Sequence, residues 1–157
     1  MIDIKYESGI YTLETKQKLN TSLENSWEFF SDPKNLSIIT PKHMNFKILN
    51  NLSEMHEGQI IKYRVSPFPF FRVSWMTEIT EVNKPYSFVD EQKKGPFSIW
   101  HHEHTFKSNK KGIIAFDKVI FKLPLGWPGI FFGGRIVKNQ LKNTFSFRKK
   151  ILKDIFK

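Results

Sequence analysis

The alternation of apolar and polar positions predicts a β-rich chain that ends in one long helix. Residues 10–19 alternate as a first strand. Six further runs rich in Phe, Val, Ile and Trp follow, bounded by Gly, Pro or Asn turns, at 46–50, 59–66, 71–82, 86–93, 97–108 and 113–123. Because the connections between these six are short, we expect an antiparallel meander, and seven strands with the first included.

Helices are predicted before and after this meander. Ser22 is placed as the N-cap of a short helix that ends at the Asp32-Pro33 breaker, and residues 34–40 can form a second short helix. In the long helix at 127–157, Gly133 and Gly134 would weaken the first turns, so the ordered part is expected to begin near Arg135. Its apolar side gathers Val137, Leu141, Phe145, Ile151, Leu152 and Ile155, and its basic side Arg135, Lys138, Lys142, Lys149 and Lys153. The helix is therefore expected to lie on the sheet.

Residues 88–106 are predicted to form the central hairpin, with its turn at Lys94-Gly95-Pro96. Side chains alternate between the faces of a strand, so each arm has one face that combines aromatic and polar residues. These faces carry Phe88, Asp90 and Gln92 on the first arm, and Trp100, His102, His104 and Phe106 on the second. A few polar groups among large aromatic rings suit the wall of a cavity better than a solvated surface.

Two further charged residues are expected to point toward the same interior. Asp117 shares strand parity with Ala115, Val119 and Phe121, and Arg148 falls in the apolar stripe of the last helix. Buried carboxylates need partners, so one interpretation is a structural network of Asp, Arg and His that joins the helix to the sheet. The alternative is that Arg148 and the histidines receive an anionic head group.

The His102-x-His104 spacing also permits a metal site, with Asp90 or Asp117 as a third ligand. Histidines that hydrogen-bond to carboxylates and an amide can satisfy one another without a metal, so we expect no tightly bound metal and no cofactor. The same groups could perform acid–base chemistry. The chain lacks cysteine, a Gly-x-Ser-x-Gly motif and a Gly-rich phosphate loop, so no nucleophile is evident.

Four motifs carry a resemblance to a known superfamily: WEFFSDP at 27–33 with Leu36, FVDEQ at 88–92, GPF at 95–97 and WHHEHTF at 100–106. With the order of predicted elements, the chain resembles the SRPBCC superfamily of START lipid-binding domains, polyketide cyclases and dehydratases, and birch-pollen-allergen-like proteins. The motifs look most like a bacterial, cell-division-inhibitor-like branch of ligand-binding proteins. The resemblance implies an α+β helix-grip fold over residues 11–151 and a cavity between the sheet and the last helix.

Several aromatic side chains are interpreted as core or as lining of that cavity. They are Tyr63, Trp75, Trp100, Phe106, Phe121 and Phe145. The apolar stretches at 67–71 and 125–132 are predicted to be loops at the cavity mouth, at a membrane-touching edge or at a dimer contact. Alternatively, they pack against each other and close one end of the sheet.

Composition and charge limit the number of domains, the cellular location and the kinds of partner that we expect. The chain has 157 residues, no cysteine, and no signal-peptide or membrane-spanning pattern, so we expect a single cytoplasmic domain at 1–157. The net charge is +10, and residues 135–157 alone carry eight Lys or Arg against one acid. This basic face is interpreted as the solvated side of the helix, with anionic membrane docking as the alternative. Nucleic acid is not expected, because aromatic residues are not interleaved with the lysines.

The sequence therefore predicts binding or transport of a small, largely apolar ligand with a polar or acidic end. Its expected contacts are Tyr63, Trp75, Asp90, Gln92, Trp100, His102, His104, Phe106, Asp117, Phe121 and Arg148. One alternative is a cyclase- or dehydratase-like enzyme that uses His102 or His104 with Asp90. Another is an interaction or membrane-surface protein that acts through its basic helix. Both a monomer and a homodimer are compatible with the sequence.

Overall fold

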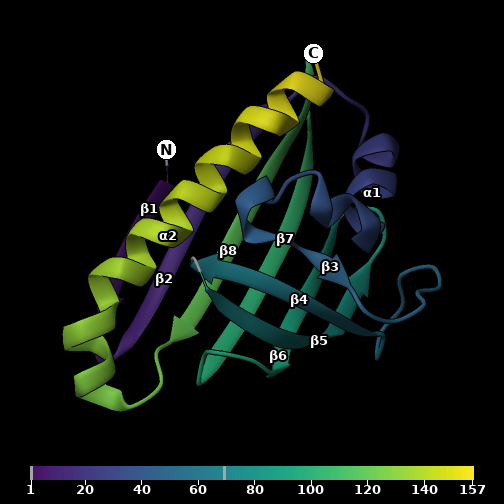
Figure 1. The fold of residues 1–157 in the computed structure, drawn as a ribbon. Coiled ribbons are helices and arrows are strands. Elements are labelled where there is room, and N and C mark those ends of the chain that lie inside the picture. The colour runs from purple at the N-terminus through teal and green to yellow at the C-terminus, as the bar shows by residue number, and fades with distance from the viewer. Residues whose placement is uncertain (1, 69) are drawn as a thin grey trace.

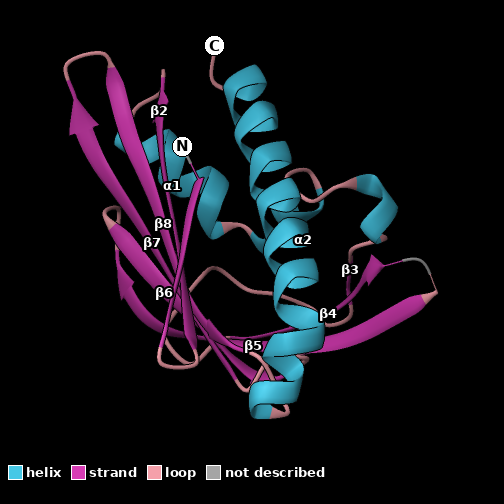
Figure 2. Ribbon diagram, turned by 90° about the vertical axis from the view of Figure 1, so that its left-hand side faces the viewer, coloured by secondary structure: helices cyan, strands magenta, loops and turns pink. Residues whose placement is uncertain are grey.

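The protein forms a curved antiparallel sheet with a long helix across its concave side (Figures 1 and 2). The computed structural model describes residues 2–68 and 70–157; the side chains of residues 127 and 129–132 are outside the description. Within this range the sheet has eight strands in the order β1-β2-β8-β7-β6-β5-β4-β3. The strands are β1 Ile2–Glu7, β2 Ile10–Leu19, β3 Lys47–Ile48, β4 Ile60–Phe68, β5 Phe71–Asn83, β6 Ser87–Lys94, β7 Ile99–Asn109 and β8 Gly112–Lys122.

The expected meander is confirmed, but the prediction of seven strands is wrong because β1 was missed. β1 pairs only with β2, at the edge of the sheet. Of its side chains, only those of Ile2 and Ile4 are partly buried, so the strand lacks a strong apolar alternation. Its turn to β2 uses positive φ angles at Ser8 and Gly9, as tight hairpin turns require. This local turn signal could have revealed the strand.

The predicted short helices are present, with shifted bounds. Helix α1 spans Leu23–Ser31, and the Ser22 side chain accepts a hydrogen bond from the Asn25 backbone N–H at 3.1 Å, which confirms the expected N-cap. The second segment is a 3-10 helix, η1 Pro33–Ser37, shorter than the predicted 34–40. A further 3-10 turn, η2 Lys42–Met44, was not predicted. These segments lie over one end of the sheet's concave side (Figure 2).

Helix α2 spans Gly126–Ile155 without interruption. The prediction that the ordered helix starts near Arg135 is therefore wrong: the cost of about 1 kcal/mol for each glycine does not end the helix. Phe145 and Leu152 are buried against the sheet, as the apolar stripe predicts, whereas Ile155, near the end of the helix, is 41% exposed.

Two apolar clusters hold the helix to the sheet. One lies beneath α1 and the end of α2, and includes Trp27, Phe88, Phe106 and Leu152. The other lies beneath the middle of α2. Its buried residues are Tyr11, Leu13, Val119, Phe121, Leu123 and Phe145. Along β8, Ala115 belongs to the first cluster and Val119 to the second, so the intervening inward position, Asp117, lies between them. The polar interior of the protein is thus flanked by two apolar regions.

Candidate functional site

Three neighbouring strands bring four titratable side chains together on the concave face. His102 and His104 on β7 are only 5% and 6% exposed, as the alternation along the hairpin predicts. In the register of the sheet, Asp90 on β6 is opposite His102, and Asp117 on β8 is opposite His104. Pairing across three strands therefore assembles the cluster without help from loops.

Each histidine of this cluster contacts both carboxylates. His102 Nε2 is 3.1 Å from Asp117 Oδ1, and His104 Nε2 is 3.0 Å from Asp90 Oδ2, both with hydrogen-bond geometry. The other two approaches are His102 Nδ1 to Asp90 Oδ2 at 3.5 Å and His104 Nδ1 to Asp117 Oδ1 at 3.2 Å. The two imidazole centroids are 3.8 Å apart, and His104 stacks on the Phe88 ring. We call these four residues the Asp-His ring.

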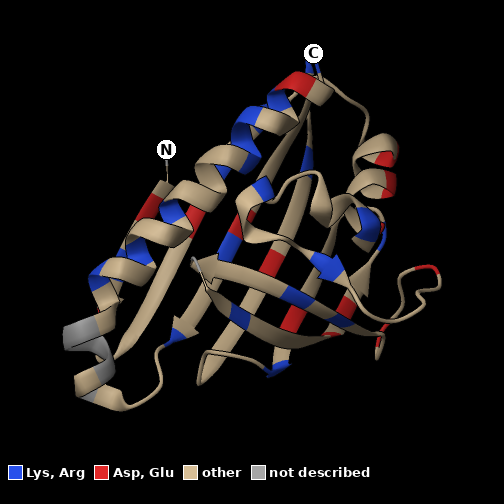
Figure 3. Ribbon diagram, in the orientation of Figure 1, with Lys and Arg blue, Asp and Glu red and all other residues tan. Residues whose placement is uncertain are grey.

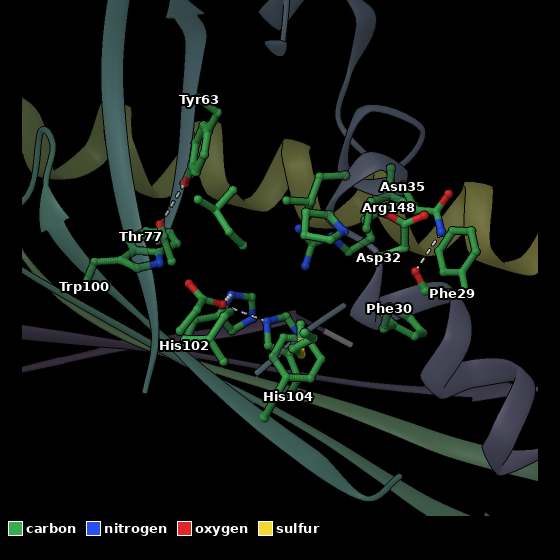
Figure 4. Close-up of a pocket in the computed structure, with 18 residues that line it drawn as sticks. Phe29, Phe30, Asp32, Asn35, Tyr63, Thr77, Trp100, His102, His104 and Arg148 are labelled. Carbon is green, nitrogen blue, oxygen red and sulfur yellow. Dashed lines mark hydrogen bonds and ion pairs between the residues drawn. The ribbon is translucent and has the colours of Figure 1, made fainter. Parts of the chain in front are cut away.

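Arg148 reaches the same cluster from α2, opposite the sheet (Figure 4). Its Nη1 is 3.6 Å from Asp117 Oδ1, and its guanidinium carbon lies 4.7 Å from the centre of the Phe145 ring. The residue is 9% exposed. Among the described residues, its Nε and Nη1 have no hydrogen-bond partner. Arg148 thus has a charge partner in Asp117 but unfilled hydrogen-bonding capacity.

Burial and charge push the two histidines in opposite directions. Burial lowers the pKa of His102, the neighbouring His104 lowers it further, and the contacts with Asp117 and Asp90 do not compensate. Burial alone would also lower the pKa of His104, but its close contacts with the negative Asp117 and Asp90 carboxylates outweigh burial and raise the pKa. The longer 3.5 Å approach of His102 Nδ1 to Asp90 fits a neutral ring that carries its proton on Nε2.

The two carboxylates stay ionised in this setting. Burial would raise the pKa of both, but for Asp90 the nearby His102 and His104 and the charge of Arg148 bring it below its ordinary value. For Asp117, the hydrogen bond from His102, the contact with His104 and the charge of Arg148 do the same. With His104 charged and His102 neutral, two negative and two positive charges balance. This balance allows four ionised side chains to be buried together.

Two cavities adjoin the cluster. The larger, of about 570 Å³, lies between the sheet and α2 and is walled mainly by apolar and aromatic side chains. The smaller, of about 120 Å³, lies beneath α1 and η1 and is drawn in Figure 4. Five residues line both: Leu36, Tyr63, Trp100, His102 and Arg148. Arg148 and His102 therefore stand where an apolar chamber meets a more polar one.

Most of the predicted contact residues line these cavities. Tyr63, Trp75, Trp100, His102 and Arg148 line the larger one, and Asp90 and His104 line the smaller. Asp117 lines neither cavity but contacts His102, His104 and Arg148, which do. Whether any of these residues contacts a ligand stays a prediction.

Three predicted contact residues have other surroundings. Phe106 and Phe121 are fully buried in the two apolar clusters. Gln92 folds back on the hairpin turn, where its amide donates to the Phe97 carbonyl at 2.6 Å and accepts from the Phe97 N–H at 3.3 Å. Gln92 therefore shapes the turn, and its side chain is not among those that line the two cavities.

Sequence reasoning missed polar residues of α2. Gln140 and Thr144 line the larger cavity. They precede Arg148 at intervals of four, which places all three on one helix face. The position of Arg148 in the apolar stripe was recognised, and extending the same spacing backward would have found the other two.

One end of the larger cavity is lined by the end of β4 and the segment that leads into α2. Pro67 and Phe68 line it from one side, and Pro124 and Leu125 from the other. Phe70 and Leu125 are among the most exposed apolar side chains of the described chain. The prediction that residues 67–71 and 125–132 form loops is wrong for most of these positions, because Pro67, Phe68 and Phe71 lie in strands β4 and β5 and α2 begins at Gly126. Their position at one end of the cavity fits the predicted mouth, although residue 69 and the side chains of 127 and 129–132 lie outside the described residues.

The Asp-His ring also has the composition of a metal site. Asp90, His102 and His104 each offer a ligand atom within 4.8 Å of the others. Against a cation, Arg148 adds positive charge beside Asp117, and both carboxylates are already hydrogen-bonded to an imidazole. The prediction that no metal is tightly bound therefore stands as a prediction.

The basic face of α2 carries Lys and Arg along its outer side, with Asp154 near the end of the helix (Figure 3). Arg135, Lys142 and Lys153 are exposed there. In the part of the chain that the structure describes, no helix has the length and apolar character needed to span a bilayer.

Comparisons with known proteins place the fold. No family model and no curated protein sequence matches the chain. Solved structures do: protein Ms6760 from Mycobacterium smegmatis has a TM-score of 0.67 at 15% identity and covers 99% of this chain and 97% of its own. The di-domain ARO/CYC protein BexL, from the BE-7585A biosynthetic pathway, has a TM-score of 0.73 at 12% identity, and the match covers 96% of this chain and 51% of BexL.

A second di-domain ARO/CYC protein, StfQ from the steffimycin biosynthetic pathway, has a TM-score of 0.70 at 8% identity, with 94% of this chain and 50% of StfQ covered. Identities this low establish shared architecture and leave the activity open. The chain therefore has an α+β helix-grip fold, similar to the folds of protein Ms6760 and of the ARO/CYC domains of BexL and StfQ.

Proposed function

We propose that the protein binds a small, largely apolar molecule in the cavity between the sheet and α2. The observation that carries this proposal is the cavity of about 570 Å³, apolar along most of its wall, with His102 and Arg148 where it meets the smaller chamber. Its volume falls within the range of about 300–1,000 Å³ that is common for ligand sites. Its wall offers large aromatic surfaces, such as Trp75 and Trp100, against which an apolar ligand can pack.

The motif resemblance adds support at a finer level. The FVDEQ and WHHEHTF motifs form β6 and β7, which supply Asp90, His102 and His104. We therefore place the protein among the ligand-binding proteins of the cell-division-inhibitor-like branch, as part of the same proposal. The ARO/CYC names of two structural neighbours are consistent with a ligand that contains aromatic or polyketide groups.

A pair of neighbouring substitutions tests ligand binding. Val137 lines the cavity, whereas Ile136 is exposed, so Val137→Trp should fill the cavity and Ile136→Trp should not. The probe is N-phenyl-1-naphthylamine, a neutral apolar dye whose fluorescence rises on burial. We expect the wild-type protein and the Ile136→Trp variant to bind it, and the Val137→Trp variant to lose binding. Equal binding by all three, or no binding by the wild-type protein, would contradict the proposal.

A second candidate function is acid–base catalysis of a cyclase or dehydratase type. The observation that favours it is His102, which lines both cavities and can accept a proton at Nδ1 as a neutral ring. Incubation of the protein with compounds that it binds, followed by mass spectrometry of the recovered compounds, distinguishes the two functions. Recovery of unchanged compounds supports a binding protein, and products that disappear in a His102→Gln variant support an enzyme.

A further inference from the structure

We propose that the ligand carries one carboxylate, and that this group binds the free hydrogen-bonding edge of Arg148 at the inner end of the cavity. The inference rests on the ligand-binding function proposed above and names the chemical class of the ligand. It would make the occupant an amphipathic acid, with its apolar body toward the β4–β5 turn and Leu125 and its charged end beneath α2.

The first support is the unmet hydrogen bonding of Arg148. A guanidinium has five N–H donors, and leaving donors of a buried charged group unpaired is costly. Within the described chain, Arg148 is 9% exposed and its Nε and Nη1 lack partners. A ligand carboxylate is an acceptor that can take two hydrogen bonds at once from one edge of a guanidinium, here from Nη2 together with either Nε or Nη1.

The second support is that Asp117 cannot fill this role where it stands. Its Oδ1 lies 3.6 Å from Arg148 Nη1, beyond hydrogen-bond distance. The same oxygen is 3.1 Å from His102 Nε2 and 3.2 Å from His104 Nδ1. Asp117 is thus held on the sheet by the two imidazoles, and Arg148 retains its charge attraction while its donors remain free.

The third support is the polarity of the surrounding wall. Arg148 lines both cavities, and Thr144 and Gln140 lie on the same helix face one and two turns before it. Across the cavity, Trp75 Nε1 is a second buried donor without a partner among the described residues. The Gln140 amide lies 3.7 Å from Met44 Sδ and the Thr144 hydroxyl donates to the Gln140 carbonyl at 3.0 Å, so among these described residues the unpartnered donors on the cavity wall are those of Arg148 and Trp75.

Matched pairs of acid and alcohol test the proposal directly. The pairs are dodecanoate with dodecan-1-ol, and 2-naphthylacetate with 2-(2-naphthyl)ethanol, measured by displacement of N-phenyl-1-naphthylamine. Charge-assisted hydrogen bonds should favour the acid of each pair by about tenfold or more in wild-type protein. In Arg148→Met the preference should fall to near parity through weaker acid binding, with alcohol binding unchanged. In Lys142→Met, which removes an exposed charge of the same helix, it should persist.

The double variant Asp117→Asn, Arg148→Met guards against a folding defect, since it removes one charge of each sign from the cluster. It should likewise bind acid and alcohol equally. Equal affinity within each pair in the wild-type protein, or an acid preference that survives in Arg148→Met, would overturn the carboxylate proposal and leave ligand binding intact. Failure of the neutral dye to bind the wild-type protein would instead remove the proposed function.

Discussion

Strand β7 carries histidines on both of its faces. The histidines of both faces contact carboxylates, but the two faces differ in their exposure to solvent. On the convex face, His101 contacts Glu91 Oε1 at 2.8 Å and Glu103 Oε1 at 3.2 Å. On the concave face, His102 and His104 contact Asp90 and Asp117 at similar distances. Each face thus pairs imidazole with two carboxylates, yet the outer group is about a quarter to two fifths exposed by side chain and the inner one is buried.

The difference shows that burial can separate the pKa values of two imidazoles that contact the same two carboxylates. At His101, burial lowers the pKa, but the hydrogen bonds that the ring donates to Glu91 and Glu103 outweigh it, so the pKa is raised. On the inner face, burial and mutual repulsion separate the two rings, and the pKa of His102 is lowered while that of His104 is raised. Water can replace a lost partner on the outer face and cannot on the inner one.

The largest expected effect comes from removing one carboxylate from each face. Asp117→Ala leaves Arg148 and two histidines buried without their shared partner, and should lower the free energy of unfolding by about 3–5 kcal/mol. Glu103→Ala on the outer face should lower it by less than about 1 kcal/mol. Urea unfolding of the two variants measures both. Equal losses would mean that the inner cluster is no more dependent on pairing than a surface ion pair.

Each titratable group of the Asp-His ring should change the stability of the protein with pH in a direction that follows from its pKa shift. Asp90 and Asp117 have lowered pKa values, so their contribution is present above the unfolded carboxyl pKa near 3.9 and is lost as pH falls through the folded values. His104 stabilises below the unfolded value near 6.5, and this is lost as pH rises through its raised folded pKa.

His102 acts with the opposite sign to His104: because its pKa is lowered, stability from its neutral form falls as pH drops below about 6.5. We therefore expect a shallow dependence near neutral pH and a steep loss in acid. Urea unfolding from pH 3 to pH 9 checks this, with Asp90→Asn expected to flatten the acid limb. An acid limb unchanged in that variant would rule out the ionised inner carboxylate.

A smaller effect should appear as separate titrations of the three histidines. Nitrogen-15 chemical shifts report the protonation of each ring nitrogen, so His102 should stay neutral at pH 7 with its proton on Nε2. His101 and His104 should remain charged to higher pH than a free imidazole. Identical titration of His102 and His104 would contradict a charged His104 beside a neutral His102.

The smallest expected effect is that of added metal. Since Arg148 and His104 already balance the two carboxylates, zinc should not bind tightly to the inner cluster. The Tm should therefore be unchanged by equimolar zinc or by EDTA, and elemental analysis of purified protein should show no stoichiometric zinc, iron or copper. A metal-dependent Tm that disappears in His104→Gln would show a metal centre instead.

The sequence predicted the features that follow from strand and helix periodicity. Alternation placed Asp90, His102 and His104 inward, parity did the same for Asp117, and the helix wheel placed Arg148 beneath α2. These predictions succeeded because burial of aromatic neighbours fixes which face of a strand or helix points to the interior. The inward orientation of these side chains could therefore be predicted from each strand or helix alone, without knowing how the strands pair.

Other features depend on tertiary contacts that no local pattern contains. Gln92 has the parity of the cavity wall, yet a nearby backbone turn provides better hydrogen bonds for its amide. Strand β1 is an exception, because its alternation is weak but the Ser8-Gly9 turn to β2 marks it locally. The position of Arg148 between two cavities could not be predicted, because it depends on how α2 is placed relative to the sheet.

Native mass spectrometry of freshly purified protein tests the central claim most directly. The account predicts that the wild-type protein and the Ile136→Trp variant carry one small apolar molecule per chain, lost on denaturation, and that the cavity-filled Val137→Trp variant carries none. Equal occupancy in the Val137→Trp variant would contradict the cavity as the binding site. A wild-type protein that is empty as purified, and that stays empty when dodecanoate, 2-naphthylacetate or their alcohols are added, would contradict ligand binding itself.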